Sequence, residues 1–345
     1  MNRNQMNNSD PALGTAIDAV AVACGVARAV QGDLDRVRQI TKDDRSPVTV
    51  ADFAVQAIIV MALRTAFGEV LIAGEERADR LRTDEHAGVR DAVIEVVRTI
   101  HAGVTAEQVL AAIDACDHDA PAEAYWTLDP IDGTKGFLRG EQYAVALAKI
   151  EHGQVVLGVM GCPNLSLDWS RPFDQADPHG AIYAAAVGSG SWQWPADDPP
   201  GKPRPVRCGT GQGSGPAKTV RVCESVEAAH SRQSDTQRIL EHLELVVEYT
   251  HLDSQCKYAV VARGQADAYL RMPTKKGYVE NVWDHAAGML IATEAGAVVT
   301  DTTGAQLDFA HGRKLRANRG VVCAAADVHG RIIEAIETLG IAATV

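Results

Sequence analysis

Residues 128–137 read LDPIDGTKGF and place two aspartates three positions apart around a proline, directly before a glycine. Pro130 cannot stand inside a helix, and it favours extended geometry at Asp129. Gly133 tolerates a positive φ angle, so the chain can turn sharply after Asp132. The stretch therefore predicts an extended segment that ends in a sharp turn carrying two acids.

This turn can present oxygen atoms to a metal ion. The carboxylates of Asp129 and Asp132 and the carbonyl of Ile131 can converge on one point, and oxygen ligands on a tight turn suit a hard cation such as Mg²⁺. Backbone N–H groups of a helix that begins at Thr134 can meet an anion. An ordinary Asp-Pro turn with Thr134 as a helix cap explains the same residues, so both interpretations stay open for this stretch alone.

Three other stretches place acids at the ends of predicted elements. IAGEE brings Glu75 to the end of a short apolar strand, where either a ligand or a solvated turn is expected. NVWDHAAG puts Asp284 in the first turn of a predicted helix, after a possible N-cap at Asn281, where the helix dipole favours an acid. SPVTVADFAVQ puts Asp52 at the start of an apolar helix, as a dipole or capping partner or as a water-positioning base. Each acid therefore also has an ordinary structural explanation.

The composition describes an ordinary globular protein. Its 345 residues are enough for one large or two medium domains, and 46% of them are hydrophobic and 23% charged. The net charge of −12 argues against non-specific binding to nucleic acid or to an anionic membrane. Acid clusters that bind metal would reconcile this charge with an anionic substrate.

Cysteine usage and hydropathy predict a cytoplasmic location. The seven cysteines contain no CxxC pair, which argues against a disulfide framework and against a zinc site. The stretch AIDAVAVACGVARAV is interrupted by Asp18 and predicts a first helix rather than a signal peptide. We expect no apolar run long enough to cross a membrane.

The pattern predicts helices over residues 10–40 and 49–67, the second capped by Thr49 with Asp52 in its first turn. A short strand, EVLIAGEE, and a largely helical region over 77–124 follow. Three strand-like runs come next, YAVALAKIE, QVVLGVMGCP and GAIYAAAVGSG, and the turn EHGQ predicts a hairpin between the first two.

The chain is predicted to form two domains of mixed α/β (α+β) class. Residues 1–200 would form an N-terminal α+β domain, 201–218 a Pro/Gly-rich loop, and 219–345 a C-terminal α/β domain. In the second domain we expect strands at TVRVCES, LVVEYTHL, ADAYLRMP, AVVTD and GVVCAAA, and helices over 225–243, 254–264, 281–295 and 326–338.

The order and spacing of GEE, DPIDGTKGF and WDHAAG, with VTVAD upstream, resemble the lithium-sensitive phosphomonoesterase superfamily over nearly the whole chain. That superfamily holds inositol monophosphatases, fructose-1,6-bisphosphatases and 3′(2′),5′-bisphosphate nucleotidases. The resemblance implies an inositol monophosphatase-like layered α/β/α/β/α sandwich with the site in a crevice between its halves. It also implies two or three Mg²⁺ ions, held by these ligands: Glu75, Asp129, the Ile131 carbonyl, Asp132 and Asp284.

The resemblance further implies hydrolysis by metal-activated water, which Asp52 and the Thr134 hydroxyl orient and deprotonate. Four carboxylates at one site repel, since two like charges 4 Å apart cost ~4 kcal/mol at an effective dielectric of ~20. Divalent cations would offset this repulsion and also hold the phosphate. No motif resembles a phosphoenzyme nucleophile, so direct attack by water is the simpler mechanism.

The stretches ESVEAAHS, HLDSQCKYAVVARGQADAYLRMP and VWDHAAG are similar to the branch that removes the 3′-phosphate of 3′-phosphoadenosine 5′-phosphate to give AMP. The substrate contacts that this similarity implies are Thr134, His230, Ser254, Lys257, Arg271 and Asp284. Without it, His230 would be a helix-surface residue and Ser254 a helix cap. Lys257 and Arg271 would be ordinary solvated cations.

Two other functions stay open from the sequence. One is an inositol- or sugar-phosphate phosphatase of the same superfamily, and the other is a non-catalytic ligand-binding relative. The presence of all the acids and of the threonine argues against lost catalysis. The expected partner is a small-molecule nucleotide, with no nucleic acid, no membrane and no obligate protein partner.

Overall fold

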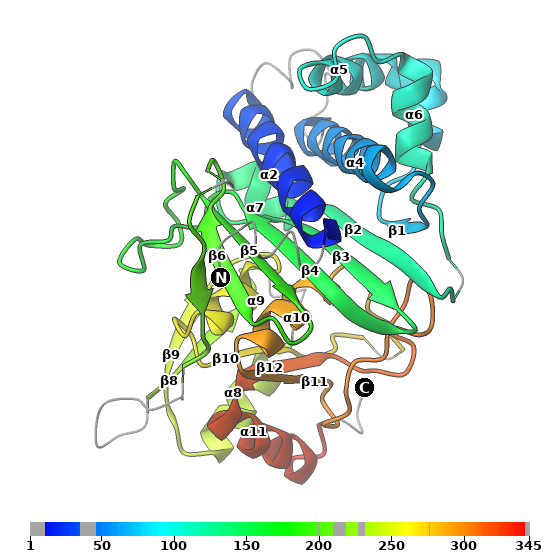
Figure 1. The fold of residues 1–345 in the computed structure, drawn as a ribbon. Helices are drawn as coiled ribbons and strands as arrows, with labels where there is room; N and C mark the ends of the chain where they lie inside the picture. The colour runs from blue at the N-terminus through cyan, green and yellow to red at the C-terminus, as the bar shows by residue number, and fades with distance from the viewer. Residues whose placement is uncertain are drawn as a thin grey trace.

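The computed structural model shows five layers in the order helix, sheet, helix, sheet, helix (Figure 1). It describes residues 11–34, 46–119, 121–198, 201–209, 219–226, 232–275 and 277–341. The helical layers hold α2 (Pro11–Gly32) with α4 (Ser46–Phe67), then α9 (Cys256–Ala262) with α10 (Ala286–Glu294), and last α8 (Gln233–His242) with α11 (Ala326–Thr338). This arrangement confirms the predicted α/β/α/β/α sandwich.

The first sheet has seven strands that pair in chain order. β1 runs parallel to β2, and the other neighbours are antiparallel. A tight turn with positive φ at His152 and Gly153 joins β3 to β4 and confirms the predicted hairpin. The strands are β1 (Ile72–Gly74), β2 (Ala124–Asp132), β3 (Ala144–Glu151), β4 (Gln154–Cys162), β5 (Ala181–Ala186), β6 (Ser191–Pro195) and β7 (Arg204–Val206).

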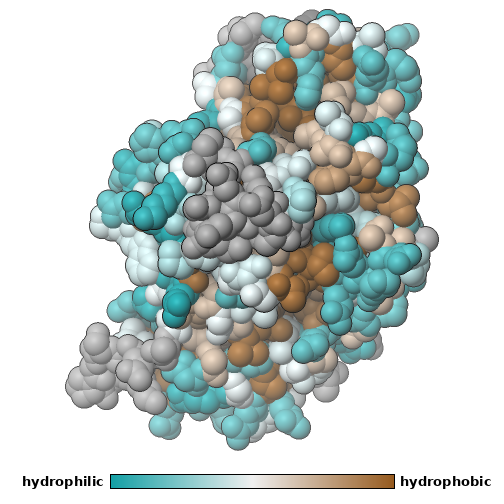
Figure 2. Space-filling model, in the orientation of Figure 1, coloured by the Kyte–Doolittle hydropathy of each residue, from teal (hydrophilic) through white to brown (hydrophobic). Residues whose placement is uncertain are grey.

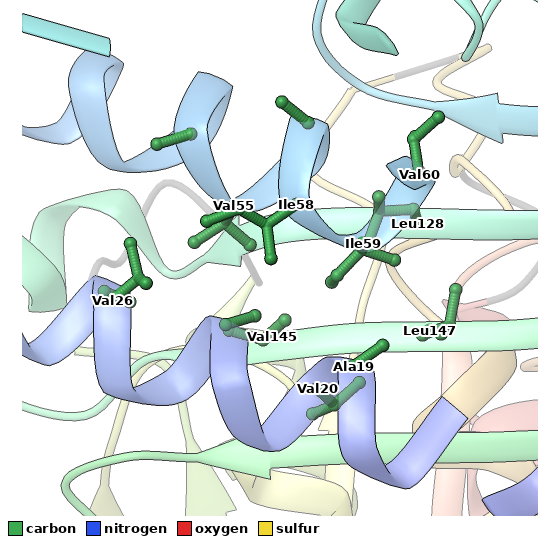
Figure 3. Packing of buried hydrophobic residues seen from close by; sticks show 14 of the residues in the cluster. Ala19, Val20, Val26, Val55, Ile58, Ile59, Val60, Leu128, Val145 and Leu147 are labelled. Atoms are coloured by element: carbon green, nitrogen blue, oxygen red, sulfur yellow. The ribbon is translucent and has the colours of Figure 1, made fainter. Parts of the chain in front are cut away.

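Both faces of this sheet are buried, and β3 shows how one strand serves two cores. Successive side chains of a strand point to opposite faces. Val145 and Leu147 pack with α2 and α4 (Figure 3), whereas Ala146 belongs to the core on the other face. Helix α10 packs closely there, because a Cβ on Gly158 would lie 3.1 Å from Ala287 Cα. A glycine at this point therefore lets the second half of the chain seat against the first sheet.

The second sheet has five strands in the order β11-β12-β10-β8-β9. Its β8–β9 and β8–β10 pairs are parallel, and β12 pairs antiparallel with β10 and β11. The strands are β8 (Thr219–Glu224), β9 (Val246–His251), β10 (Ala268–Arg271), β11 (Ala297–Thr300) and β12 (Val321–Ala325). The remaining short elements are η1 (Ala78–Arg82), η2 (Asp84–His86), α5 (Ala87–Arg98), α6 (Ala106–Asp114) and α7 (Thr134–Arg139).

The first two helices differ from their predicted limits. The helix predicted over 10–40 is observed as α2 (Pro11–Gly32), and residues 10 and 35–40 of that range lie outside the described part of the chain. The second begins at Ser46 rather than after Thr49, so Asp52 lies in its second turn and Thr49 is not its N-cap. The prediction was wrong because proline is compatible with a first helical turn, which allows this helix to start earlier than the threonine.

The helix predicted over 281–295 begins only at Ala286. Asp284 therefore precedes the helix, and Asn281 is not its N-cap. The Asn281 side chain instead donates a hydrogen bond from Nδ2 to Asp284 Oδ2 over 3.3 Å. The carboxylate is held by a neighbouring side chain rather than by a helical position.

The Pro/Gly-rich region is partly a strand. β7 lies inside the predicted 201–218 loop and pairs with β6, which precedes the loop. The sequence prediction missed both strands because Trp, Pro and Arg interrupt their hydrophobic pattern. The helix predicted over 225–243 is observed only over α8 (Gln233–His242), because residues 225, 226 and 232 are not helical, and residues 227–231 lie outside the described part of the chain. The division into domains at 200 and 219 stays a prediction.

Two described helices are long and apolar enough to cross a membrane, contrary to the sequence expectation. These are Pro11–Gly32 and residues 49–67 of α4, and 61% of each apolar window is buried inside the protein. Both supply core residues against the first sheet (Figure 3). Figure 2 shows apolar surface near α2 and α5, where a hollow of about 530 Å³ lies between the two helices. The cytoplasmic location stays a prediction.

Candidate active site

A cavity of about 520 Å³ collects residues from both halves of the chain. It lies where the ends of β1, β2 and β10 meet the start of α7 and the segments before α9 and α10. Nine of the residues selected from the sequence line it: Glu75, Asp129, Ile131, Asp132, Thr134, Ser254, Lys257, Arg271 and Asp284. Segments more than a hundred positions apart thus meet in one hollow.

The turn after Asp132 has the predicted geometry. Pairing of β2 with β3 shifts between Asp129 and Asp132, so the strand leaves its regular ladder there. Gly133 has φ 90° and is followed by α7, which begins at Thr134. A Cβ on Gly133 would lie 2.9 Å from Ser254 Cβ, so only glycine lets the two segments approach this closely.

Four carboxylates, Glu75, Asp129, Asp132 and Asp284, form what we call the acid end of the cavity. Burial raises the pKa of each one, and repulsion from other acids adds to this at Glu75, Asp129 and Asp132. At Asp284 the charges of Arg271 and His285 oppose the effect of burial. Burial and the charges of Asp284, Glu76 and Asp132 raise the pKa of Glu75 to about 8. Glu75 and Asp129 thus have other acids, rather than cations, as their charged neighbours.

The acid end fits a hard divalent cation. All four groups offer oxygen atoms, and Asp129 Oδ1 is buried without a hydrogen-bond partner among the described residues. Glu75 and Asp129 also share a side-chain hydrogen bond, which requires a proton on one of the two carboxyls. A cation at this place would satisfy the lone oxygen and replace that proton.

A second acidic group, Glu280 with Asp284 and His285, also brings its ligand atoms within 4.8 Å of one another. Glu280 already has a cation, because Arg271 approaches its two oxygens at 2.9 Å each. Burial acts to raise the pKa of Glu280, but Arg271 and His285 outweigh it and lower the pKa to about 2. We therefore assign the metal-binding potential to the acid end and not to this group.

Asp52 lies in an adjoining cavity of about 660 Å³, which shares Glu75 with the first. Its side chain is buried, and burial together with the charges of Glu76 and Glu75 raises its pKa well above the ordinary value. Thr134 stands exposed at the start of α7. His230, the other predicted residue, lies outside the described residues.

Lys257 and Arg271 form the cation end of the cavity, and Glu280, which does not line it, pairs with Arg271. Lys257 is buried, donates from Nζ to the Leu252 carbonyl over 3.1 Å and lies 5.3 Å from the Tyr269 ring centroid. Burial lowers its pKa. Arg271 is held by Glu280, and its Nη2 lies 3.9 Å from Asp284 Oδ2. The interpretation of these residues as ordinary solvated cations is wrong.

The family model of the inositol monophosphatase family matches residues 9–340. This chain belongs to the inositol monophosphatase family. The 3′(2′),5′-bisphosphate nucleotidase of Schizosaccharomyces pombe is 42% identical over 307 residues, 86% of this chain and 85% of that protein. The enzyme of the same name from Oryza sativa is 36% identical over 350 residues, 94% of this chain and 93% of that protein. The predicted resemblance to the nucleotidase branch is confirmed.

Solved structures of the inositol monophosphatase family share the fold. The inositol monophosphatase from Anabaena (Nostoc) sp. superimposes with a TM-score of 0.59 at 17% identity, covering 96% of this chain and 97% of that one. Members of the family generally depend on Mg²⁺, and the acid end offers the oxygen donors that this ion prefers. The predicted roles of individual residues stay predictions.

The sequence did not indicate three residues that line this site or hold one of its side chains. Glu280 stands four positions before Asp284, and its pairing with Arg271 could not be found from spacing alone. Asp253 lines the cavity and forms an ion pair with Arg139 of α7. Tyr278 also lines the cavity and is 44% exposed. Of the three, Asp253 alone had a sequence signal, because it directly precedes Ser254, a predicted substrate contact.

Proposed function

We propose that this protein is a Mg²⁺-dependent phosphomonoesterase that hydrolyses 3′-phosphoadenosine 5′-phosphate to AMP and phosphate. One observation carries the proposal: a single cavity joins an acid end, in which Glu75 and Asp129 have no cationic neighbour among the described residues, to a cation end with Lys257 and Arg271. The first suits a metal and a scissile phosphate, and the second suits the rest of an anionic nucleotide. Relatives at 36–42% identity bear the corresponding name.

Two or three Mg²⁺ ions would occupy the acid end. Their positive charge would neutralise the carboxylates and stabilise charge on the transferring phosphoryl group. The proposed ligands are Glu75, Asp129, the carbonyl of Ile131, Asp132 and Asp284.

In the proposed mechanism, a water molecule attacks the phosphorus atom of the 3′-phosphate. An oxygen–phosphorus bond forms as the ester bond to the 3′-oxygen breaks, and the leaving oxygen takes a proton from solvent. The Thr134 hydroxyl orients the water, and Asp52 receives its proton. Asp52 lines the adjoining cavity that shares Glu75, so in this proposal the proton would be relayed to it from the water.

The cation end would select the nucleotide. Arg271 offers a planar donor fork that suits a base edge or a second phosphate, and Glu280 fixes the orientation of that fork. Lys257 belongs to the same end. Burial lowers its pKa, and the charge of Asp132 acts against this. Ser254 and Thr134 border the same cavity and would contact the substrate, as would His230 outside the described residues.

A phosphate-release assay tests the proposal. We expect rapid release from 3′-phosphoadenosine 5′-phosphate with Mg²⁺, none with EDTA, and much slower release from inositol 1-phosphate. Faster hydrolysis of the inositol ester would instead identify an inositol phosphatase, and no release from any ester would favour a non-catalytic relative.

Lithium provides a second test of the proposed site. Li⁺ fits a small site of hard oxygen ligands but carries half the charge of Mg²⁺, so it should inhibit. Full activity in high-millimolar LiCl, at constant ionic strength set with KCl, would count against this form of the metal site.

A further inference from the structure

Gln255 connects the two halves of the acid end. Its backbone N–H donates to Asp132 Oδ2 over 2.6 Å. Its side-chain Nε2 donates to the carbonyl of Trp283 over 2.9 Å, directly before Asp284 in the chain. One residue is thus bonded both to a carboxylate of the first half and to the segment that carries a carboxylate of the second.

The same side chain also fixes the start of α10. Gln255 Oε1 accepts a hydrogen bond from the backbone N–H of Gly288 over 3.1 Å. The first N–H groups of a helix have no partner within the helix, and the residue before α10, His285, supplies no side-chain cap. Gln255 therefore caps α10 from outside and sets where the segment before it lies.

The environment leaves Gln255 little freedom. The residue is 2% exposed, and both side-chain polar groups have buried partners. Helices α9 and α10 touch here, because a Cβ on Gly288 would lie 2.3 Å from the Tyr258 ring. Water cannot easily replace a lost amide in such a place, so its backbone partners would be left unpaired.

We propose that Gln255 is a positioning residue that sets the spacing between the carboxylates of Asp132 and Asp284, and through it the affinity of the site for divalent metal. This inference rests on the proposed function, in which both aspartates bind metal. Groups that orient metal ligands commonly govern affinity strongly, although they never touch the metal themselves.

Binding of Mn²⁺ to the purified full-length protein, followed by electron paramagnetic resonance of the free ion, tests this inference without turnover. Gln255→Met keeps an unbranched side chain of similar length but cannot make both hydrogen bonds. We expect Mn²⁺ affinity to fall about tenfold, at the lower end of the range for lost outer-shell partners. The Mg²⁺ concentration for half-maximal activity should rise by a similar factor, with the nucleotide KM nearly unchanged.

Gln142→Met is the matched control. Gln142 is also 2% exposed, and its Nε2 donates to the backbone carbonyls of Asn164 and Phe173, outside the acid end. This variant should lose comparable buried hydrogen bonds while keeping wild-type Mn²⁺ affinity. An equal loss of affinity in both variants would overturn the proposal, because it would show a general effect on stability.

The remaining outcomes also decide the matter. A folded Gln255→Met protein with wild-type Mn²⁺ affinity overturns the proposal. If it does not fold, Gln255→Glu replaces it, because that change keeps an acceptor for the Gly288 N–H. If neither variant folds, Gln255 is a folding residue and the proposal is wrong. Failure of the wild-type protein to bind Mn²⁺ or Mg²⁺ would contradict the proposed function itself, which separates the two failures.

Discussion

The acid end and the cation end of the cavity both bury charge, but they balance it differently. At the cation end, Arg271 meets both oxygens of Glu280, and the pKa of that carboxyl falls to about 2. At the acid end, Glu75 and Asp129 have mainly other acids as charged neighbours, and burial and repulsion raise their pKa values. One end is complete as folded, whereas the other needs positive charge from outside the chain.

This difference indicates where a ligand is needed to complete the structure. Buried charges are normally paired, and an unpaired group is commonly a binding site or a protonated acid. Net charge alone would not have found it, since acids are spread over the whole chain. The contrast predicts that changes at the acid end affect catalysis on every substrate, whereas changes at the cation end affect nucleotides alone.

The largest effect is expected for Asp132→Asn, which removes charge from the acid end. Phosphate release at saturating Mg²⁺ should fall more than ~100-fold, because loss of outer-shell partners already costs up to that factor. The fold should persist, since less repulsion remains in the metal-free protein. Phosphate release and thermal melting check this, with the exposed Asp168→Asn as control. A folded variant with near-normal activity would remove Asp132 from the metal site.

Thr134→Ala should lower kcat by ~100-fold or more, the range for general acid–base assistance, and change KM little. The hydroxyl is proposed to act on water mainly in the transition state. Thr134→Ser keeps the hydroxyl and should retain much of the rate. Steady-state kinetics with both substrates check the result, and a drop of less than about threefold would reduce Thr134 to a helix-start residue.

Arg271→Ala should weaken nucleotide turnover by about 1.5–3 kcal/mol, the range for a charge-assisted hydrogen bond. Slow hydrolysis of inositol 1-phosphate should change little, because that substrate does not reach the arginine. Comparison of kcat/KM for the two esters measures the effect. Equal losses on both would make Arg271 structural.

A double variant separates contact from charge in that experiment. Arg271→Ala leaves Glu280 buried without its main cation. The double variant Arg271→Met with Glu280→Gln removes both charges. Because it still lacks the arginine contact, it should discriminate poorly between the nucleotide and inositol 1-phosphate. Recovery of nucleotide turnover in the double variant would show that the unpaired Glu280 caused the loss.

The smallest expected effect is on the pH dependence of stability. Carboxyls whose pKa is raised in the folded protein stabilise it at low pH and cease to do so as pH rises through the folded pKa. For Glu75 that window runs from 4.5 to about 8. In EDTA the acid end should therefore cost at least ~1.4 kcal/mol of stability across the window, the equivalent of one pKa unit.

Thermal melting at several pH values, with EDTA and with Mg²⁺, measures this. Mg²⁺ should raise Tm more at pH 8 than at pH 4.5, because protons compete with the metal for the same oxygens. In EDTA, the Tm of the Asp132→Asn variant should fall less between pH 4.5 and pH 8 than that of the wild type. A Tm without pH dependence in this window would mean that the acids at this end are balanced within the chain.

The local features of the fold were predictable from the sequence. The turn at Gly133, the hairpin between β3 and β4 and the helix after β12 depend on residues that are close in the chain. Proline, glycine and alternating apolar residues act through backbone sterics and side-chain direction, which need no distant partner. The order of the motifs GEE, DPIDGTKGF and WDHAAG also identified the family, because these motifs contain the acids that the fold brings together.

Tertiary structure decided which charged groups are paired. Glu280 stands four positions before Asp284, yet Arg271 contacts both oxygens of Glu280 at 2.9 Å and lies 3.9 Å from Asp284, which lines the cavity. The start of α10 is bonded to a distant segment, since Gln255, directly before α9, accepts a hydrogen bond from the Gly288 N–H. A sequence specifies which side chains can ionise and where the backbone can turn. The charge state of those side chains depends on desolvation and on neighbours that only the folded chain supplies.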